Sequence, residues 1–444
     1  MRKYGILKLI LVNFAKGNKM MNQKNFVIKG NIIYSKSKTE LEMKEHAYLV
    51  CEDGKCAGVY ETLPEQYHGF ACEDYSDCLI IPGMTDLHIH APQYSYRGLG
   101  MDMELLDWLN VHAFPEESKF ADLTYAKKAY RIFVDDMVKS TTTRACIFGT
   151  LHKDATLLLM ELLEDAGMRA YVGKVNMDRN SPDILREESA ESASKITEQW
   201  ILEAERFDNV RQILTPRFIP SCSDELMREL SRLQKKYELP MQSHLSENLG
   251  EIAWVQDLCP DSKFYGDAYD QFELFGGECP TIMAHCVHSG EEEVKLMKEK
   301  NVFVAHCPQS NTNIASGIAP VRMYLEKDLK MGLGSDVAGG AHLSLMRAMT
   351  DAIQCSKLRW RMYDQSLEPL KFEEAFYLAT KGGGEFFGKV GSFEEGYEFD
   401  VVVLSDENLP HPQEISTKER LERIAYLGDD RNVKSKYIAG KLVK

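Results

Sequence analysis

Short apolar segments alternate with amphipathic helical segments through the middle of the chain, from about residue 80 to about residue 340. The segments 123–140 and 291–300, for example, have a helical spacing of apolar residues and stand between strand candidates. This alternation predicts parallel β/α units. Eight strand candidates indicate a (β/α)8 TIM-like barrel, with its site at the C-terminal ends of the strands. They are residues 80–90, 141–149, 168–178, 213–218, 240–247, 281–288, 301–308 and 330–336.

Both ends of the chain have a different pattern, of short strands joined by turns. Residues 25–81 contain an Asp53-Gly54 pair, which is typical of a hairpin turn between strands. Residues 397–406 and 434–443 are again strand-like. We therefore expect the two ends to combine in one small β-domain.

The predicted fold class is α/β, with two domains. We expect a small β-sandwich-like domain from residues 22–80 and 390–444, and a catalytic barrel from residues 81–389. A chain of 444 residues is long enough for a barrel and one further domain.

The first twenty residues contain an apolar run, Tyr4 to Ala15, that is interrupted by Lys8. The run is too short and too charged to span a bilayer. We expect a loose extension outside the fold, with Met20 or Met21 near the start of the folded part. A secretory signal is the alternative.

Charge and cysteine content exclude several classes of partner. The formal net charge of −15 disfavours nucleic acid, because phosphate binding depends on clustered Lys and Arg. The eleven cysteines are scattered singly, with no C-x-x-C pair, which favours a reducing compartment without disulfides. We expect a cytoplasmic protein that binds neither nucleic acid nor membranes.

Histidines and an aspartate stand at the ends of four predicted strands. His88 and His90 end the first strand two residues apart, so their side chains share one face. His244, His285 and Asp336 end the fifth, sixth and eighth strands. A lone histidine at a strand end is usually hydrogen-bonded filler, but the whole set predicts a metal site. Imidazole and carboxylate suit zinc, with iron or manganese as alternatives.

Four segments resemble the metal-binding strand ends of the amidohydrolase superfamily: PGMTDLHIH, QSHLSEN, AHCVHSG and GLGSDVAGG. Within it, two segments resemble the guanine deaminase family: PGMTDLHIHAPQYSYRG and LTPRF. The similarity runs from about Ile80 to Gly340. It implies a homodimeric purine-metabolism hydrolase that takes guanine as substrate and converts it to xanthine and ammonia.

The same resemblance bears on the number of metal ions. Two-metal members of the superfamily carry a carboxylated lysine at the end of the fourth strand, where this chain has Arg217. Lys174 lies on the third strand instead. A single zinc ion is therefore implied, with His285 as a further ligand or as the group that orients the water. The other expected ligands are His88, His90, His244 and Asp336.

Two carboxylates are candidates for proton transfer. Glu247 follows His244 by three residues and can donate a proton to N3 of the purine when water attacks C2. Asp336 can accept the proton of the attacking water. The alternative for Glu247 is a helix-start carboxylate without a catalytic role.

The resemblance also implies substrate-binding residues. Gln93 offers an amide to the purine edge, Arg217 can donate to the 6-oxo group, and Phe218 can stack on the ring. His90, His244 and Glu247 would also contact the base. Trp108 either closes over the site or packs as part of an amphipathic helix. For Arg217 the alternative is a structural ion pair with a nearby carboxylate.

Two other classes of function remain open at this point, another enzyme of the superfamily and a non-enzymatic scaffold. Another one-metal aminohydrolase or a chlorohydrolase of the superfamily would have the same metal site. Only Gln93, Arg217 and Phe218 therefore distinguish a guanine deaminase from these enzymes. The zinc deaminases with H-x-E and P-C-x-x-C are excluded, because neither pattern occurs. A non-enzymatic scaffold is disfavoured, because every ligand position is filled.

Overall fold

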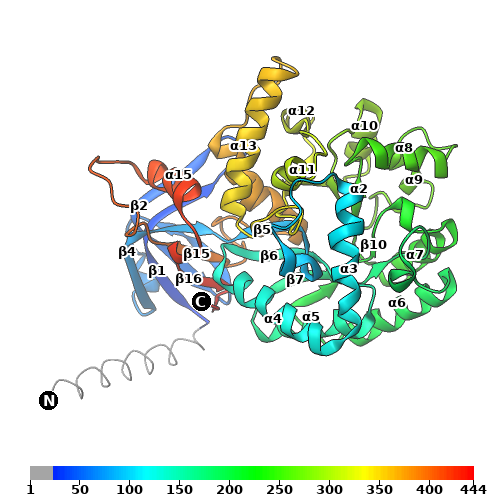
Figure 1. Cartoon of the computed structure of the whole chain (residues 1–444). Coiled ribbons are helices and arrows are strands. Elements are labelled where there is room, and N and C mark those ends of the chain that lie inside the picture. The colour runs from blue at the N-terminus through cyan, green and yellow to red at the C-terminus, as the bar shows by residue number, and fades with distance from the viewer. Residues whose placement is uncertain (1–23) are drawn as a thin grey trace.

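The structure, a computed structural model, describes residues 24–444. The extension predicted within the first twenty residues lies outside the described part. Figure 1 shows a barrel ringed by helices and, beside it, a sheet that contains both the early and the late strands of the chain.

Eight parallel strands form the barrel, in the order β11-β12-β13-β14-β5-β6-β7-β9. The ring closes where Leu214 pairs with Met241, because the Leu214 N–H donates to Pro240 O and the Gln242 N–H donates to Leu214 O, both at 2.9 Å. This ring confirms the barrel predicted from the alternating pattern. Its strands are β5 (Met84–His90), β6 (Thr142–Phe148), β7 (Arg169–Gly173), β9 (Val210–Gln212), β11 (Met241–Leu245), β12 (Thr281–His285), β13 (Phe303–His306) and β14 (Lys330–Leu333).

The fourth barrel strand differs from its prediction of residues 213–218. The hydrogen-bonded strand is β9, which begins and ends earlier, and residues Thr215–Pro216 form a separate short strand, β10, that pairs with β8 (Val175–Asn176). The reason is Pro216, which has no N–H to donate to a continuous ladder. The chain therefore leaves the ring just before Arg217.

The other sheet combines both ends of the chain, as predicted, in the order β17-β16-β15-β4-β1-β2-β3. Asp53 and Gly54 form the tight turn between β2 and β3, with φ of 48° and 79°, values that suit a hairpin turn. The strands are β1 (Phe26–Ser35), β2 (Leu41–Glu52), β3 (Lys55–Tyr60), β4 (Ala71–Pro82), β15 (Val401–Leu404), β16 (Val433–Ile438) and β17 (Lys441–Leu442).

The sandwich-like form predicted for this domain is not confirmed, because its seven strands belong to one continuous sheet. The edge strand β3 curls back toward the segment before β15, where the Cys56 N–H donates to Tyr397 O at 2.8 Å. The curled sheet encloses a small core of its own, which includes Phe26, Phe399 and Val401.

Amphipathic helices cover the outside of the barrel (Figure 1). In α7, the cap Ser223 accepts a hydrogen bond from the Leu226 N–H, and Leu226, Leu230 and Leu233 are buried on one face. The segments predicted as helices at 123–140 and 291–300 correspond to α4 and α10. The helices are α2 (Leu105–Trp108), α3 (Phe114–Glu117), α4 (Leu123–Lys139), α5 (Lys153–Asp165), α6 (Ala190–Ala204), α7 (Asp224–Tyr237), α8 (Leu249–Leu258), α9 (Tyr265–Asp270), α10 (Glu291–Glu299), α11 (Pro308–Asn313), α12 (Val321–Glu326), α13 (Leu345–Met362), α14 (Phe372–Tyr377) and α15 (Thr417–Leu427).

Buried charged groups attach the sheet to the barrel. Arg144 of β6 donates to Asp400 through Nε at 2.5 Å and Nη2 at 3.0 Å. Lys436 of β16 donates from Nζ to three backbone oxygens, those of Met137, Ser140 and Thr142. The sheet therefore supports the end of the barrel where the strands begin, opposite the site.

No helix among residues 24–444 is both long and apolar enough to cross a membrane. All eleven cysteines fall within this range and are free thiols.

Candidate metal centre and substrate pocket

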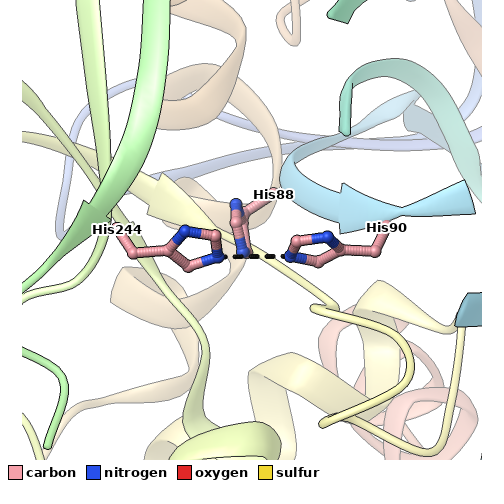
Figure 2. A group of neighbouring side chains, drawn as sticks. All are labelled: His88, His90 and His244. Carbon is pink, nitrogen blue, oxygen red and sulfur yellow. Dashed lines mark hydrogen bonds between the residues drawn. The ribbon is translucent and has the colours of Figure 1, made fainter. Parts of the chain in front are cut away.

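The predicted histidines meet at the mouth of the barrel. His88 and His90 lie at the end of β5, and His244 lies on β11, which pairs with the segment after β9 to close the ring. Figure 2 shows the three imidazoles turned toward a common point. The Nε2 atoms of His90 and His244 are 3.2 Å apart. The alternation of side chains along β5 therefore places both of its histidines toward the site, as predicted.

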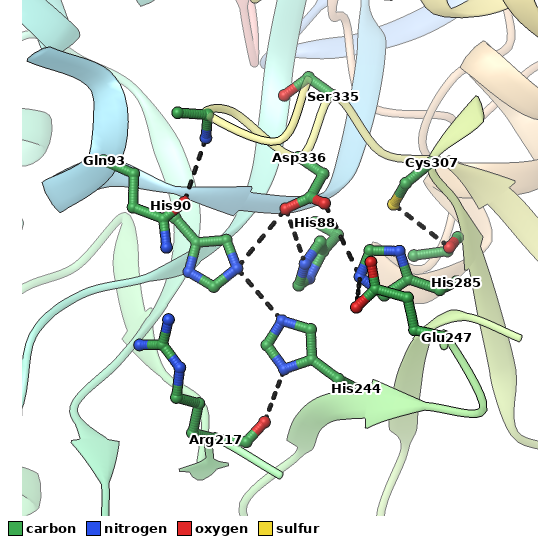
Figure 3. A network of polar contacts seen from close by, with 12 residues as sticks. His88, His90, Gln93, Arg217, His244, Glu247, His285, Cys307, Ser335 and Asp336 are labelled. Carbon is green, nitrogen blue, oxygen red and sulfur yellow. Dashed lines mark hydrogen bonds and ion pairs between the residues drawn. The ribbon is translucent and has the colours of Figure 1, made fainter. Parts of the chain in front are cut away.

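Asp336 joins this cluster from the loop after β14. Its Oδ1 lies 3.2 Å from Nε2 of His88 and 3.5 Å from Nε2 of His90. Its Oδ2 lies 3.7 Å from Nε2 of His285, the last residue of β12. Three of the predicted histidines thus surround the Asp336 carboxylate, and His244 joins them through His90 (Figure 3).

Outer hydrogen bonds orient two of the imidazoles. The Nδ1 of His244 is 2.6 Å from the backbone oxygen of Arg217, and a carbonyl oxygen can only accept. His244 therefore donates through Nδ1 and keeps a lone pair on Nε2, which faces the cluster. The Nδ1 of His285 is likewise 2.8 Å from the Oδ1 of Asn311. Such second contacts fix the tautomer that a metal ligand needs.

The cluster fits a divalent metal ion. His88 is fully buried, and although its Nε2 lies 3.2 Å from Asp336 Oδ1, neither of its ring nitrogens has a partner in hydrogen-bond geometry. An unsatisfied nitrogen inside a protein is costly, and coordination of Nε2 to a metal would remove that part of the cost. The ligand atoms of His88, His90 and His244 lie within 4.8 Å of one another, and so do those of His88, His285 and Asp336.

The protonation states also suit metal ligation, which requires neutral imidazole and ionised carboxylate. Burial, and then the nearby His88, holds the pKa of His90 and of His244 well below its usual value. Burial acts to raise the pKa of Asp336, but His88, His285 and His90 together outweigh it and lower that pKa.

Glu247 lies beside the cluster, where the chain leaves β11. Its Oε2 is 3.5 Å from Nε2 of His285, and its Oε1 accepts from Ser316 Oγ at 3.2 Å. Burial, and then the negative charge of Asp336, raises the pKa of Glu247 well above its usual value. The raised pKa favours the protonated form of the side chain, which can act as a proton donor.

The helix-start alternative for Glu247 finds no support in the local hydrogen bonds. At the start of α8, the capping box is made by Asn248 and Glu251. The backbone N–H of Glu247 donates to Glu251 Oε2 at 3.2 Å, and its own carboxylate turns toward the barrel.

A pocket opens above the cluster, and the predicted substrate residues line it. Gln93 and Arg217 lie on one side of the histidines, with His285 and Glu247 on the other (Figure 3). Phe218 also faces the pocket, and its ring meets Trp254 edge to face at 6.1 Å. The structure therefore gathers the predicted site residues from distant parts of the sequence around one cavity, and all of them except the fully buried His88 line it.

One residue of this region, Glu117 at the end of α3, was not predicted. Arg217 donates to it through Nη1 at 2.7 Å and Nη2 at 3.1 Å, and both side chains are only 4% exposed. Gln93 Nε2 donates to the same carboxylate at 2.8 Å. The ion pair considered for Arg217 thus exists, although Arg217 also lines the pocket.

Comparison with known proteins adds a family to this geometry. The model of the amidohydrolase family matches residues 79–443, well over half of the chain. The chain belongs to the amidohydrolase family.

Relatives of this amidohydrolase share most of its length. The guanine deaminase of Dictyostelium discoideum is 42% identical over 380 residues, which cover 84% of each chain. The guanine deaminase of Mus musculus is 36% identical over 440 residues, which cover 94% of this chain and 96% of the mouse protein. A crystal structure of guanine deaminase from C. acetobutylicum, with guanine bound in its active site, is 49% identical, has a TM-score of 0.92 and covers 95% of this chain and 100% of that one.

Trp108 of this amidohydrolase lines the pocket and is 3% exposed. With Leu105 and Leu109 it forms an apolar wall, and its Nε1 donates to Leu99 O at 3.3 Å. The spacing of these three residues along a helix was a sequence signal for one shared face. That signal does not distinguish a pocket wall from an ordinary core.

Lys174 of this amidohydrolase is not free at the mouth of the barrel. Its Nζ donates to Glu187 Oε1 at 2.6 Å, and both side chains are buried. The lysine on the third strand is therefore held in an ion pair away from the histidine cluster, as expected of a residue outside the metal site.

Proposed function

We propose that this chain is a guanine deaminase, which hydrolyses guanine to xanthine and ammonia. The observation that carries the proposal is the combination of a histidine–aspartate cluster with Gln93 and Arg217 in one pocket. A relative 49% identical holds guanine in its active site, which supports a purine as the substrate here.

The proposed cofactor is one zinc ion per chain, because neutral imidazoles and a carboxylate are the ligands that zinc prefers. A zinc ion bound here would activate water by Lewis-acid chemistry and so make a nucleophile available near neutral pH. His285 would be a further ligand or would orient the attacking water. The other residues that would hold the ion are His88, His90, His244 and Asp336.

Two carboxylates would move the protons of the reaction. Water attacks C2 of guanine, the ionised Asp336 accepts one of its protons, and the protonated Glu247 donates to N3. The C2–N bond then breaks, and the amino group leaves as ammonia with the proton from Asp336. The proton of the new hydroxyl returns to Glu247, so xanthine is formed and both carboxylates regain their starting states.

The pocket walls would hold the base in place for this attack. Arg217 would donate to the 6-oxo group, and Gln93 would meet the adjacent edge of the ring. Phe218 would stack on the base, and His90, His244 and Glu247 would contact it from the side of the reacting carbon.

We propose two domains, a catalytic barrel of residues 81–389 and a supporting β-domain of residues 22–80 and 390–444.

We also propose a cytoplasmic homodimer. The far end of α13 projects from the barrel (Figure 1) and exposes Leu358, Met362 and Tyr363 by 50%, 69% and 70%. Exposed apolar groups of this kind are typical of contact surfaces. Analytical ultracentrifugation showing only monomer at micromolar concentration would contradict the dimer.

The experiment that tests the function is a substrate panel. Purified zinc-loaded protein is given aminopurines, aminopyrimidines and aminotriazines, and ammonia release is measured. We expect guanine to have the highest kcat/KM. A pyrimidine or triazine as the best substrate would instead favour another aminohydrolase, and release of chloride from a chlorotriazine would favour a chlorohydrolase. No turnover of any ring by the metal-loaded protein would favour a scaffold.

A further inference from the structure

Glu117 lies behind the pocket wall and binds the two side chains that face the substrate. Its carboxylate accepts three hydrogen bonds, two from Arg217 at 2.7 and 3.1 Å and one from Gln93 at 2.8 Å. Arg217 and Gln93 line the pocket, and the Glu117 side chain is 4% exposed. Glu117 is therefore placed to act on a substrate through its neighbours.

The contacts of Arg217 fix the plane of its guanidinium. The two bonds to Glu117 form a fork, which holds both terminal nitrogens at once. The ring of Phe114 lies 5.3 Å from Cζ of Arg217. A guanidinium has five N–H groups, so three remain for other acceptors after Glu117 takes two.

The orientation of the Gln93 amide is fixed in the same way. Its Oε1 accepts from the Ala338 N–H at 3.2 Å, and its Nε2 donates to Glu117. A backbone N–H can only donate and a carboxylate can only accept, so the amide cannot be reversed without losing both bonds. One donor and one acceptor position of Gln93 stay available.

Together these groups offer a defined pattern to a flat base. Arg217 presents donors only, whereas Gln93 presents a donor and an acceptor. A ring edge with a carbonyl next to an N–H matches this pattern. An edge with an amino group next to an unprotonated ring nitrogen presents a donor where Arg217 also has a donor, and such a mismatch in a buried site strongly disfavours binding.

We propose that Glu117 is a positioning residue that sets the preference for 6-oxo over 6-amino purines, by holding Arg217 and Gln93 in this arrangement. The inference rests on the proposed function. Glu117 also neutralises Arg217, which would otherwise be an unpaired buried cation next to a site that holds a metal cation. Loss of Glu117 would thus change both the orientation of Arg217 and Gln93 and the net charge of the pocket wall.

The test is Glu117→Gln, which keeps the size of the side chain. Glu117 accepts from two nitrogens of Arg217 and one of Gln93, and an amide would turn its own NH2 group toward at least one of them. The paired hydrogen bonds to Arg217 therefore cannot form as before. We expect kcat/KM for guanine to fall about 10²-fold, mainly through a higher KM, because small misplacements in a site have effects of that size. The preference for guanine over 2,6-diaminopurine should shrink at least about tenfold by the same mismatch logic.

The neighbouring residue supplies a matched control. Glu116 lies on the same short helix, but its carboxylate binds Lys119 and Tyr125 and is not part of the pocket. Glu116→Gln should leave both kcat/KM and the purine preference unchanged. Glu117→Asp keeps the negative charge and should restore part of the preference. Zinc content and melting temperature, measured for each variant, show whether the fold is retained.

Binding of xanthine gives a second readout that needs no turnover. Xanthine has the same 6-oxo and N1–H edge, so its inhibition constant should weaken in Glu117→Gln by about the same factor as KM rises for guanine. The effect should be smaller in an Arg217→Met background, which retains only the part that acts through Gln93.

The outcomes separate two failures. A wild-type protein that does not deaminate guanine overturns the proposed function whatever Glu117 does. An active wild type whose folded Glu117→Gln variant keeps the full preference for guanine and the full affinity for xanthine overturns the role of Glu117.

Discussion

The Nε2 atoms of His90 and His244 lie 3.2 Å apart, within hydrogen-bonding distance. His244 already donates through Nδ1 to the backbone oxygen of Arg217, so its Nε2 carries a lone pair. Burial holds the pKa of His90 well below its usual value, which favours the neutral ring, and the contact is a hydrogen bond in the tautomer of His90 that carries its proton on Nε2. In the other tautomer both Nε2 lone pairs face the same point, as two ligands of one metal ion must. The pair is therefore placed to bind a metal ion in common.

We predict one equivalent of bound metal per chain. His88→Ala, His90→Ala and His244→Ala should each remove most of the metal and the deaminase activity, because each change deletes a donor of one small cluster. Elemental analysis of purified protein checks the stoichiometry, and chelation should lower the melting temperature because bound metal stabilises the folded state. Two equivalents in a fully active protein would contradict the one-metal proposal.

We predict that Glu247→Gln keeps the metal but loses proton transfer to the ring. The raised pKa of Glu247 favours its protonated form, and an amide of the same shape cannot give up that proton. The expected loss is about 10² to 10⁴ in kcat, the usual contribution of general acid–base catalysis. A variant with near-normal kcat and normal zinc content would show that another group supplies the proton.

The residues of the metal cluster could be predicted because each one lies at or just after the C-terminal end of a barrel strand. Closure of the ring brings these ends together, so the positions of His88 and His285 follow from the order of strands. Asp336 and Arg217 stand beyond the ends of β14 and β9, so their exact placement also depends on the loops that follow these strands.

Other features depend on contacts that no local pattern reveals. Glu117 meets Arg217 across 100 positions of sequence, and its segment FPEE has the pattern of a surface helix. The end of the fourth strand was misplaced because Pro216 breaks a run that is otherwise apolar and strand-like. The single curled sheet could not be predicted, since hairpin patterns do not say which edges meet.

We predict that Glu251 makes the stability of the protein fall as the pH rises toward 7. Burial, and then Glu247, raises the pKa of Glu251 to about 7 in the folded state. A raised pKa means that folding stability is fully present below the usual carboxyl pKa and is lost as the pH rises through the folded value. The shift corresponds to roughly 3 kcal/mol between about pH 4 and pH 8.

Glu251→Gln tests this prediction through the pH dependence of the free energy of unfolding. A change in stability that the substitution causes equally at every pH does not affect this dependence. Denaturant unfolding of wild type and variant at several pH values should show the wild type losing stability relative to the variant as the pH rises. Glu299→Gln, an exposed position on α10, should run parallel to the wild type. Parallel curves for Glu251→Gln would show that this carboxyl titrates normally.

We predict that Lys436 is a main attachment between the sheet and the barrel. Its fully buried Nζ donates to the backbone oxygens of Met137, Ser140 and Thr142 at 2.8, 3.1 and 3.0 Å. The first two oxygens belong to the C-terminal end of α4, where Met137 O also accepts from the N–H and the hydroxyl of Ser140. Lys436→Met removes the donor that the three oxygens share.

The expected cost of Lys436→Met is about 3 kcal/mol in the free energy of unfolding, because a buried group that loses its partner costs about 1 to 3 kcal/mol. Lys434→Met is the matched control, since Lys434 is exposed on the same strand and should change stability little. Equal unfolding midpoints for the two variants would contradict the role given to Lys436.

We predict that Arg217 is the group that discriminates guanine from 6-amino purines. Its guanidinium can donate to a 6-oxo group, whereas a 6-amino group leaves it facing another donor in a buried pocket. Arg217→Ala alone would also leave Glu117 as an unpaired buried carboxylate, so part of its effect would be lost stability. The double change Arg217→Met with Glu117→Gln removes both charges and so separates the effect on recognition from the effect of burying an unpaired charge.

We expect the double variant to keep zinc, because it changes none of the proposed ligands. The backbone oxygen of residue 217, which accepts from His244, also remains. Its kcat/KM for guanine should fall sharply while that for 2,6-diaminopurine changes less, so the ratio of the two narrows. Steady-state kinetics on both purines measure that ratio. If the double variant still prefers guanine by the wild-type factor, discrimination lies with Gln93, whose amide also meets the same edge of the ring.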